Sequence, residues 1–185
     1  MFDQKKKRAF QKAVLSASLL AVNMYQGLRI LLLSYFITHI PITLLVDAQI
    51  VFGELYPVPL QALFAWYVSS FGDIVLRESG IWLKSFIYSE VALQLPFFFY
   101  AVDALWNHTE QDKTFSVCAL AYGVHVATTV LPIISTILFS NEIQGEGERW
   151  TLVAIYLPYF GIPLFLALEA AGNLVEKRSN AAKKA

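Results

Sequence analysis

The chain has 185 residues, and charged side chains make up 15% of it, against about 25% in a typical soluble domain. Hydrophobic residues account for 57%, aromatic residues for 15%, and the mean hydropathy is +0.54. This composition excludes a disordered chain and indicates a membrane protein. The formal net charge of zero excludes the basic balance of a typical nucleic-acid binder, and the single cysteine, Cys118, excludes a disulfide framework.

Four charge-poor runs are long enough to cross a bilayer, which requires about 20 mostly apolar residues in a helix. They cover residues 30–46, 85–102, 114–141 and 150–168, and the second contains a single charged residue, Glu90. We therefore predict an all-α membrane protein that is a bundle of four transmembrane helices.

The run over residues 55–72, between the first and second predicted spans, has a different character. It lacks charge but contains Pro57, Pro59 and five aromatic residues. Aromatic rings settle in the headgroup region of a bilayer, so we expect an interfacial helix here rather than a fifth span.

Residues 13–28 form a further apolar run, which follows the basic stretch Lys5-Lys6-Lys7-Arg8. A signal peptide has a similar pattern, but no convincing small-residue cleavage site precedes Arg29. We expect three parts: a basic and hydrophobic leader or extension over residues 1–28, the four-helix membrane domain over 29–172, and a basic cytosolic tail over 173–185.

The basic residues predict the orientation. With four spans, both termini lie on the same side of the membrane. Eleven of the 14 Lys and Arg residues then lie on that side, and three lie on the other. The positive-inside rule therefore predicts that both termini are cytosolic.

Ionisable side chains inside a span mark functional sites, because a charge at the bilayer centre costs about 2.5–3.5 kcal/mol on insertion scales. Glu90 lies near the middle of the second span, with Gln94 one helical turn later on the same face. Asp47 ends the first span, and His39 lies two turns earlier on the same face. Pro41 between them is expected to kink the helix. These residues predict a polar seam along two spans.

The third and fourth spans carry polar faces of the same kind. Tyr122, His125 and Thr129 recur at helical spacing in the third span, and Tyr156 and Tyr159 in the fourth. If the faces converge, they enclose an apolar cavity with two carboxylates, which is a common small-molecule site in a helical bundle. Two carboxylates in a low dielectric share one proton and keep one negative charge, which favours a lipophilic amine. Tyrosine faces add cation–π attraction, and a sterol could occupy the apolar remainder.

Each polar residue also has a purely structural interpretation. Asp47 could cap its helix at the lumenal interface, and Glu90 could hydrogen-bond a neighbouring helix. Asp73 is interpreted as a structural hydrogen-bonding or capping group. His39 and His125 are interpreted as core or pocket-lining residues, because neither has a second His or Cys at metal-ligand spacing. The sequence therefore predicts no metal site and no cofactor.

One motif in the first span is Ser34-Tyr35-Phe36-Ile37-Thr38-His39-Ile40-Pro41-Ile42-Thr43-Leu44, followed by Asp47 and Gln49. The motifs that follow it are Glu54-Leu55-Tyr56-Pro57, Trp66-Tyr67, Trp82-Leu83-Lys84-Ser85-Phe86, Glu90, Gln94-Leu95-Pro96-Phe97-Phe98, Val124-His125, Thr128-Thr129, Thr151-Leu152-Val153 and Tyr156-Leu157-Pro158-Tyr159. In this order they resemble the sigma-2 receptor family, which is related to the emopamil-binding sterol isomerases. The motifs are specific because polar and apolar positions match together.

The resemblance implies the EXPERA fold, a four-helix bundle resident mainly in the endoplasmic reticulum. It also implies a lipid-accessible pocket that binds sterols and cationic amphiphilic drugs. Asp47 matches the acid that pairs with the ligand amine, Glu90 matches the carboxyl hydrogen-bonded to it, and Asp73 matches a structural acid. The positions that match the ligand-binding pocket lining are His39, Gln94, Tyr122, Thr129, Tyr156 and Tyr159.

Three functional hypotheses follow from the sequence and from what this resemblance implies. The leading one is a non-enzymatic intramembrane protein that binds sterols and cationic amphiphiles and acts in sterol homeostasis or trafficking. The second is a sterol Δ8–Δ7 isomerase that uses Asp47 and Glu90 as acid and base. The third is an endoplasmic-reticulum adaptor in protein quality control linked to mitochondrial precursors. The expected partners are a sterol or other lipid, lipophilic amines, membrane proteins and a second copy of the chain, but no nucleic acid.

Overall fold

The computed structural model describes residues 24–143 and 145–183, and its regular elements there are all helices. Four helical stretches are long and apolar enough to cross a membrane. They are Met24–Leu55, Ile81–Trp106, Lys113–Phe139 and Glu146–Ala182. The predicted all-α, four-span architecture is therefore confirmed. Three stretches extend beyond the predicted apolar run at both ends, because a helix continues past the hydrocarbon core into polar sequence. The third begins one residue before the predicted run but ends at Phe139, two residues before the predicted end at residue 141.

The first span is interrupted where the sequence predicts a kink. An α-helix over residues 24–42 is followed by the π-helical turn η1 (Thr43–Asp47), the short helix α2 (Gln49–Phe52) and the 3₁₀ turn η2 (Gly53–Leu55). The amide of Ala48 donates to the carbonyl of Thr43 at 2.9 Å, which is the five-residue bond of a π turn. Of the predicted leader, residues 24–28 begin this helix, and residues 1–23 lie outside the described part of the chain.

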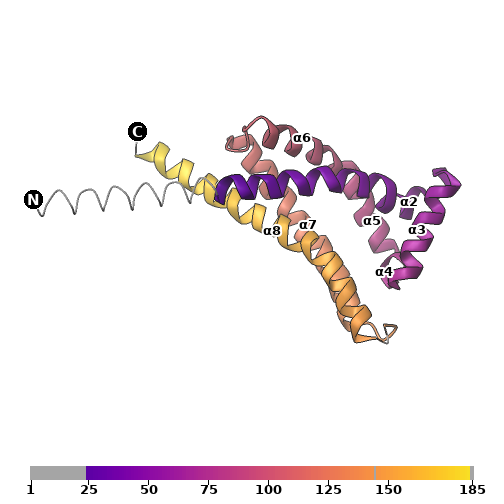
Figure 1. Ribbon diagram of the computed structural model, residues 1–185. Helices are drawn as coiled ribbons and strands as arrows, with labels where there is room; N and C mark the ends of the chain where they lie inside the picture. The colour runs from indigo at the N-terminus through magenta and orange to yellow at the C-terminus, as the bar shows by residue number, and fades with distance from the viewer. Residues whose placement is uncertain (1–23, 144, 184–185) are drawn as a thin grey trace, which may run out of the picture.

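The predicted interfacial segment forms the helix α3 (Val58–Phe71), followed by the short helix α4 (Ile74–Glu78). Pro59 lies in the first turn of α3, where its missing N–H costs nothing, and Gly72 ends the helix with a φ of 62°. Leu63 and Trp66 are exposed on α3. In Figure 1, α3 and α4 lie together at the end of the molecule opposite to the start of the first helix.

The second span has the same interruption as the first. It consists of α5 (Ile81–Ser89), the π-helical turn η3 (Glu90–Gln94) and α6 (Leu95–Trp106). Pro96 has no N–H to donate to the carbonyl of Ala92, so the normal ladder cannot form there. The amide of Leu95 instead reaches back five residues to the carbonyl of Glu90. Pro96 therefore favours the wide π turn that begins at Glu90, the one charged residue in the apolar run of this span.

The third and fourth spans, α7 (Lys113–Phe139) and α8 (Glu146–Ala182), form a long antiparallel hairpin, as Figure 1 shows. Their close approach requires Gly123. A Cβ at this position would lie 2.2 Å from the carbonyl oxygen of Pro163 and 2.8 Å from the Cβ of Ala167. The beginning of the first helix and the end of α8 meet at one end of the bundle, where Lys177 hydrogen-bonds the carbonyl of Gln111.

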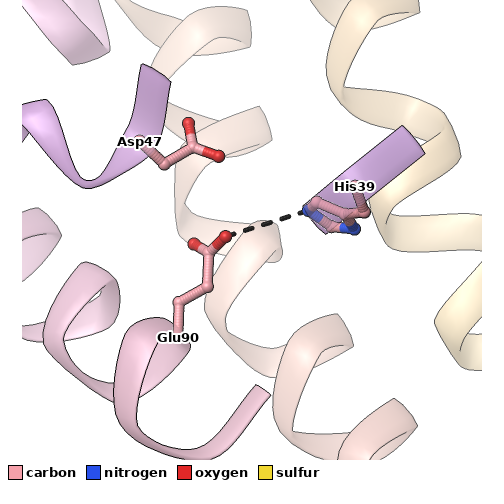
Figure 2. A group of neighbouring side chains, drawn as sticks. All are labelled: His39, Asp47 and Glu90. Carbon is pink, nitrogen blue, oxygen red and sulfur yellow. Dashed lines mark ion pairs between the residues drawn. The ribbon is translucent and has the colours of Figure 1, made fainter. Parts of the chain in front are cut away.

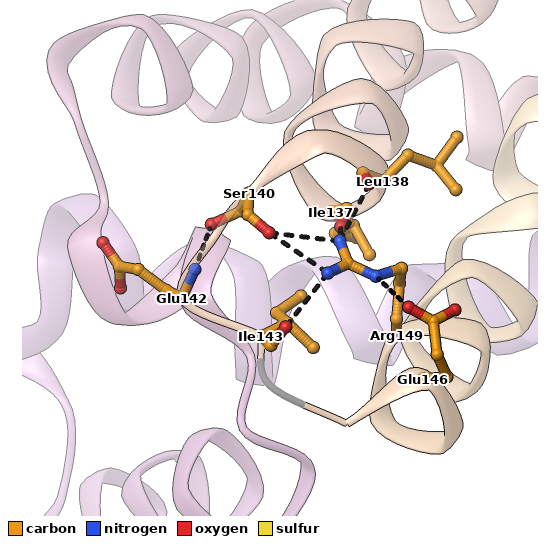
Figure 3. A network of polar contacts seen from close by, with 7 residues as sticks. All are labelled: Ile137, Leu138, Ser140, Glu142, Ile143, Glu146 and Arg149. Carbon is orange, nitrogen blue, oxygen red and sulfur yellow. Dashed lines mark hydrogen bonds and ion pairs between the residues drawn. The ribbon is translucent and has the colours of Figure 1, made fainter.

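The turn between α7 and α8 is held by the guanidinium group of Arg149, as Figure 3 shows. A helix leaves its last four carbonyls without helical partners. Arg149 Nη1 donates to the carbonyls of Ile137 at 2.7 Å, Leu138 at 2.8 Å and Ser140 at 3.2 Å, and Nη2 donates to those of Ser140 at 3.2 Å and Ile143 at 3.0 Å. Its Nε lies 3.5 Å from a carboxylate oxygen of Glu146. One side chain thus caps α7 and fixes where α8 starts.

The main core between the spans is aromatic. We call it the aromatic core; its rings belong to Tyr35, Phe36, Phe97, Phe98, Phe115 and Tyr122. Phe36 and Phe98 are fully buried, and the rings of Phe97 and Tyr122 stack with centroids 4.6 Å apart. Other large apolar side chains of the spans face outward, as expected for helices that contact lipid; examples are Leu31, Val124, Leu131 and Leu168.

Candidate functional site

A cavity of about 270 Å³ lies among the four spans, next to the aromatic core. Its walls are mostly apolar side chains from α5, α7 and α8. Its polar lining residues are His39, Asp47, Tyr67, Glu90, Gln94, Thr129, Tyr156 and Tyr159. Small-molecule sites are generally apolar cavities with a few converging polar groups and a volume of about 300–1,000 Å³. This cavity has that form, and its volume lies just below the lower end of that range.

The two carboxylates of the cavity come from the two π-helical turns. Asp47 is the last residue of η1 and Glu90 is the first residue of η3. Thr43, also in η1, donates from its Oγ1 to Glu90 Oε1 at 2.5 Å and so joins the two turns. π turns occur often at functional sites, because the extra residue re-aims the side chains around it. Here both wide turns direct a carboxylate into the same cavity.

Figure 2 shows His39 beside these carboxylates. Its Nε2 lies 3.8 Å from Glu90 Oε1, and one nitrogen or oxygen atom from each of His39, Asp47 and Glu90 lies within 4.8 Å of the others. These three residues could hold a cation between them. Among the described residues, no Lys or Arg lines the cavity, so its ionisable acidic groups have no fixed positive partner there.

Aromatic rings hold the imidazole of His39 in place. The ring stacks on Phe98 with a centroid distance of 4.6 Å and meets Tyr35 at 5.1 Å and Tyr159 at 4.8 Å, both edge-on. His39 is only 6% exposed, and its Nδ1 has no hydrogen-bond partner within the described part of the chain. The aromatic core therefore sets the direction in which Nε2 points.

Asp73 takes a different position from the other two acids. It is fully buried at the N-cap of α4, where its Oδ1 accepts from the amides of Val75 at 3.0 Å and Leu76 at 3.1 Å. Its Oδ2 accepts from the hydroxyl of Tyr156 at 2.8 Å. Burial raises the pKa of Asp73, and the hydrogen bonds from Leu76, Tyr156 and Val75 oppose that rise. This geometry fits a structural acid that orients Tyr156 at the cavity wall.

The structure brings together seven of the eight residues predicted to bind a ligand. Those that line the cavity are His39, Asp47, Glu90, Gln94, Thr129, Tyr156 and Tyr159. Tyr122 lies outside the lining: its hydroxyl is 3.3 Å from that of Tyr35, and its ring belongs to the aromatic core. The ligand-binding role of these residues remains a prediction, and the position of Tyr122 favours packing instead.

Two site residues were not singled out from the sequence. Thr43 donates a hydrogen bond to Glu90. Its place on the polar face could have been predicted, because it lies four residues after His39 and four before Asp47. Tyr67 reaches the cavity from α3. Nothing in the local sequence of an interfacial helix indicates such a contact, since it depends on how α3 folds back against the spans.

The comparisons with known proteins agree with this architecture. The family model of EXPERA (EXPanded EBP superfamily) matches residues 59–170, which run from the start of α3 far into α8. The chain belongs to the EXPERA family. Within the family, sigma intracellular receptor 2 of Homo sapiens is 42% identical to this chain over 145 residues, which cover 72% of this chain and 81% of the relative. The same receptor of Xenopus tropicalis is 43% identical over 142 residues, covering 72% and 82%.

A second kind of relative is also similar to this EXPERA protein. Efficient mitochondria targeting-associated protein 19 of Schizosaccharomyces pombe is 33% identical over 152 residues, which cover 80% of this chain and 77% of the relative. The resemblance predicted from the sequence motifs, to the sigma-2 receptor family with its EXPERA domain, is therefore confirmed.

Proposed function

We propose that this protein is a non-enzymatic intramembrane receptor for lipophilic amines and sterols, acting in sterol homeostasis or trafficking in the endoplasmic reticulum membrane. One observation carries the proposal: Asp47 and Glu90 point into one apolar cavity among four spans. The similarity to sigma intracellular receptor 2 supports a receptor, and neither kind of relative reported above is named as an enzyme.

The charge of the cavity favours a single cation. Two carboxylates this close in a low-dielectric interior cannot both stay ionised at small cost, so they hold one proton between them and one negative charge remains. An ammonium group neutralises that charge. The rings of Tyr67, Tyr156 and Tyr159 border the same space and add cation–π attraction.

The remaining walls suit the apolar body of the ligand. They include Leu83 and Ile87 on α5 and Val126, Val130 and Ile133 on α7. A hydrocarbon body that packs against these side chains gains about 25 cal/mol for each Å² removed from water. A lipophilic amine uses the carboxylates and the walls together, whereas a sterol uses the walls and donates its hydroxyl to a carboxylate or accepts from Gln94.

The test is binding to purified protein in a mild detergent. A labelled lipophilic amine is titrated into wild type, Asp47→Asn and Asp103→Asn, and an unlabelled sterol is added as a competitor. Asp103 is the matched control, because this exposed carboxylate at the end of α6 accepts from Asn107 and does not line the cavity. Both substitutions remove one acid with little change in shape.

We expect saturable amine binding that the sterol displaces in wild type. Asp47→Asn should weaken it at least about 100-fold, since truncating one partner of a buried charge pair costs 2–5 kcal/mol. Asp103→Asn should change it by less than about threefold. Equal amine affinity of Asp47→Asn and wild type would overturn the assignment of the site.

The similarity to efficient mitochondria targeting-associated protein 19 favours a second candidate function, an adaptor for protein quality control. In that case the cavity serves as a lipid sensor and a membrane-protein partner carries the function. The discriminating variant is Val130→Phe, which fills the cavity from α7. A partner that co-purifies equally with wild type and with Val130→Phe supports the adaptor, and loss of all partners on washing argues against it.

A further inference from the structure

We propose that His39, Asp47 and Glu90 form a binding site for a divalent transition-metal ion, and that Zn²⁺ is the ion that their chemistry fits best. The inference goes beyond the proposed receptor function, because it concerns a different ligand class and requires no amine or sterol. It rests on the position, charge and orientation of these three side chains.

The distances allow a shared ion. Zn²⁺ takes His nitrogen and carboxylate oxygen ligands at about 2.0–2.2 Å, which places tetrahedral ligand atoms about 3.3 Å apart. One ligand atom from each of the three residues already lies within 4.8 Å of the others, and His39 Nε2 is 3.8 Å from Glu90 Oε1. To reach that spacing, the three ligand atoms would have to approach one another by at most about 1.5 Å.

The charges also match a divalent ion once the proton that the two carboxylates share has left. Two ionised carboxylates and a neutral imidazole carry two negative charges, and Zn²⁺ neutralises both. Among the described lining residues, no Lys or Arg offers an alternative partner. A charge in the membrane interior is affordable only when it is paired, so a divalent ion satisfies both acids in their ionised form, whereas an ammonium satisfies the single charge that remains when they share a proton.

The ligand types select among metals. Mg²⁺ and Ca²⁺ prefer sites made of oxygen ligands, whereas this group offers an imidazole nitrogen with two carboxylates. Thiolate ligands would favour Cu(I) or an iron–sulfur cluster, but Cys118 does not line the cavity. An accessible zinc site usually has three protein ligands and a fourth coordination position that is open to a cavity, which is what these three residues would provide.

The surroundings hold the ligand atoms in position. Phe98, Tyr35 and Tyr159 fix the plane of the His39 ring, and Thr43 donates to Glu90 Oε1. The proton of a neutral imidazole can stay on Nδ1, which leaves the lone pair of Nε2 for the metal. A hydrogen bond to a ligand carboxylate, like the one from Thr43, is typical of metal sites, and losing one costs about 10–100-fold in metal affinity.

The experiment uses the full-length protein in detergent, stripped of metal with a chelator. Co²⁺ is titrated in as a spectroscopic stand-in for Zn²⁺, its visible ligand-field absorption is recorded, and Zn²⁺ is then added to displace it. The variants are His39→Gln, Asp47→Asn and Thr43→Val. His125→Gln is the matched control, because His125 lies in a span, faces Ser89 at 3.1 Å and does not line the cavity. Circular dichroism checks that each variant is folded.

We expect one Co²⁺ per wild-type chain, with the absorption of a four-coordinate ion, displaced by Zn²⁺ but not by Mg²⁺ or Ca²⁺. His39→Gln and Asp47→Asn should weaken binding by more than about 100-fold, Thr43→Val by about 10–100-fold, and His125→Gln by less than about threefold. Absence of saturable Co²⁺ and Zn²⁺ binding to folded wild type, or equal binding by His39→Gln and wild type, would overturn the site.

The amine assay separates this inference from the proposed function. Amine binding without metal binding overturns only the metal site, and metal binding without amine binding overturns only the amine receptor. If both bind, Zn²⁺ and the labelled amine should displace each other, since both need Asp47 and Glu90. Simultaneous binding of the two would show that the ion lies elsewhere and would contradict the assignment.

Discussion

The aromatic core and the cavity lie between the same four spans, yet they are built in opposite ways. Around the aromatic core the helices are regular, and the rings of Phe36 and Phe98 are completely buried. Around the cavity the first two spans widen into the π turns η1 and η3, and two carboxylates face inward. Regular helices with large rings give dense packing, whereas wide turns with short polar side chains leave a space.

The two regions also differ in what holds them together. Apolar burial stabilises the aromatic core, whereas individual polar contacts hold the frame of the cavity. These contacts are the bond from Thr43 to Glu90 and the bond from Tyr156 to Asp73; beyond the cavity, Arg149 caps the end of α7 in the same polar manner. The comparison teaches that one four-helix membrane bundle can combine a densely packed aromatic region with a region that encloses a cavity.

The largest expected effect comes from emptying the aromatic core. Phe98→Ala should lower the free energy of unfolding by about 3–5 kcal/mol, because it removes a fully buried ring and leaves a void. Phe86→Ala is the control, since Phe86 already borders the cavity and its loss should cost about 1 kcal/mol. Unfolding in mixed micelles measures both. Similar losses in the two variants would mean that the two regions are packed alike.

The next effect tests the polar cap that Arg149 forms at the turn between α7 and α8. Arg149→Met should lower the free energy of unfolding by about 2–3 kcal/mol, because a partly buried cation that satisfies several carbonyls is lost. The comparison variant is Arg77→Met: this half-exposed arginine pairs with Glu142 at 2.5 Å, and a surface pair contributes at most about 1 kcal/mol. If Arg149→Met costs no more than Arg77→Met in the same assay, the hairpin turn does not depend on this cap.

A smaller effect tests the close approach of α7 and α8. Gly123→Ala should destabilise by about 1–3 kcal/mol, because the added methyl meets the backbone of Pro163 and forces the helices apart. Gly161→Ala provides the reverse case: its Cβ meets nothing within 4 Å, so the better helix former should raise stability by about 0.5–1 kcal/mol. Thermal unfolding that shifts both variants in the same direction would contradict the helix contact.

Much of the fold was predictable from the sequence because membrane-spanning helices must satisfy their own backbone and show long apolar runs. The ends of the helices could not be predicted in this way, since α8 continues to Ala182 through polar residues that the hydropathy pattern excludes. Within one helix, spacing placed His39 on the face of Asp47 and Gln94 on the face of Glu90, and all four line the cavity.

Contacts between helices were harder to predict. The bond from Thr43 to Glu90 depends on which spans are neighbours, which no local pattern reveals. Tyr122 shows the limit of spacing within a helix. It shares a face with Thr129, but seven residues correspond to about 10 Å along the axis, so Tyr122 lies at the depth of the aromatic core while Thr129 lines the cavity.

The most direct test of the central claim, that ligands bind at the carboxylates in the cavity and not elsewhere, is photoaffinity labelling with a photoreactive lipophilic amine, followed by peptide mapping. The account predicts adducts within residues 83–94 of the second span and 126–133 of the third, competed by unlabelled amine and lost in Asp47→Asn. Adducts within residues 97–105 or 115–122, or labelling that is unchanged in Asp47→Asn, would contradict it.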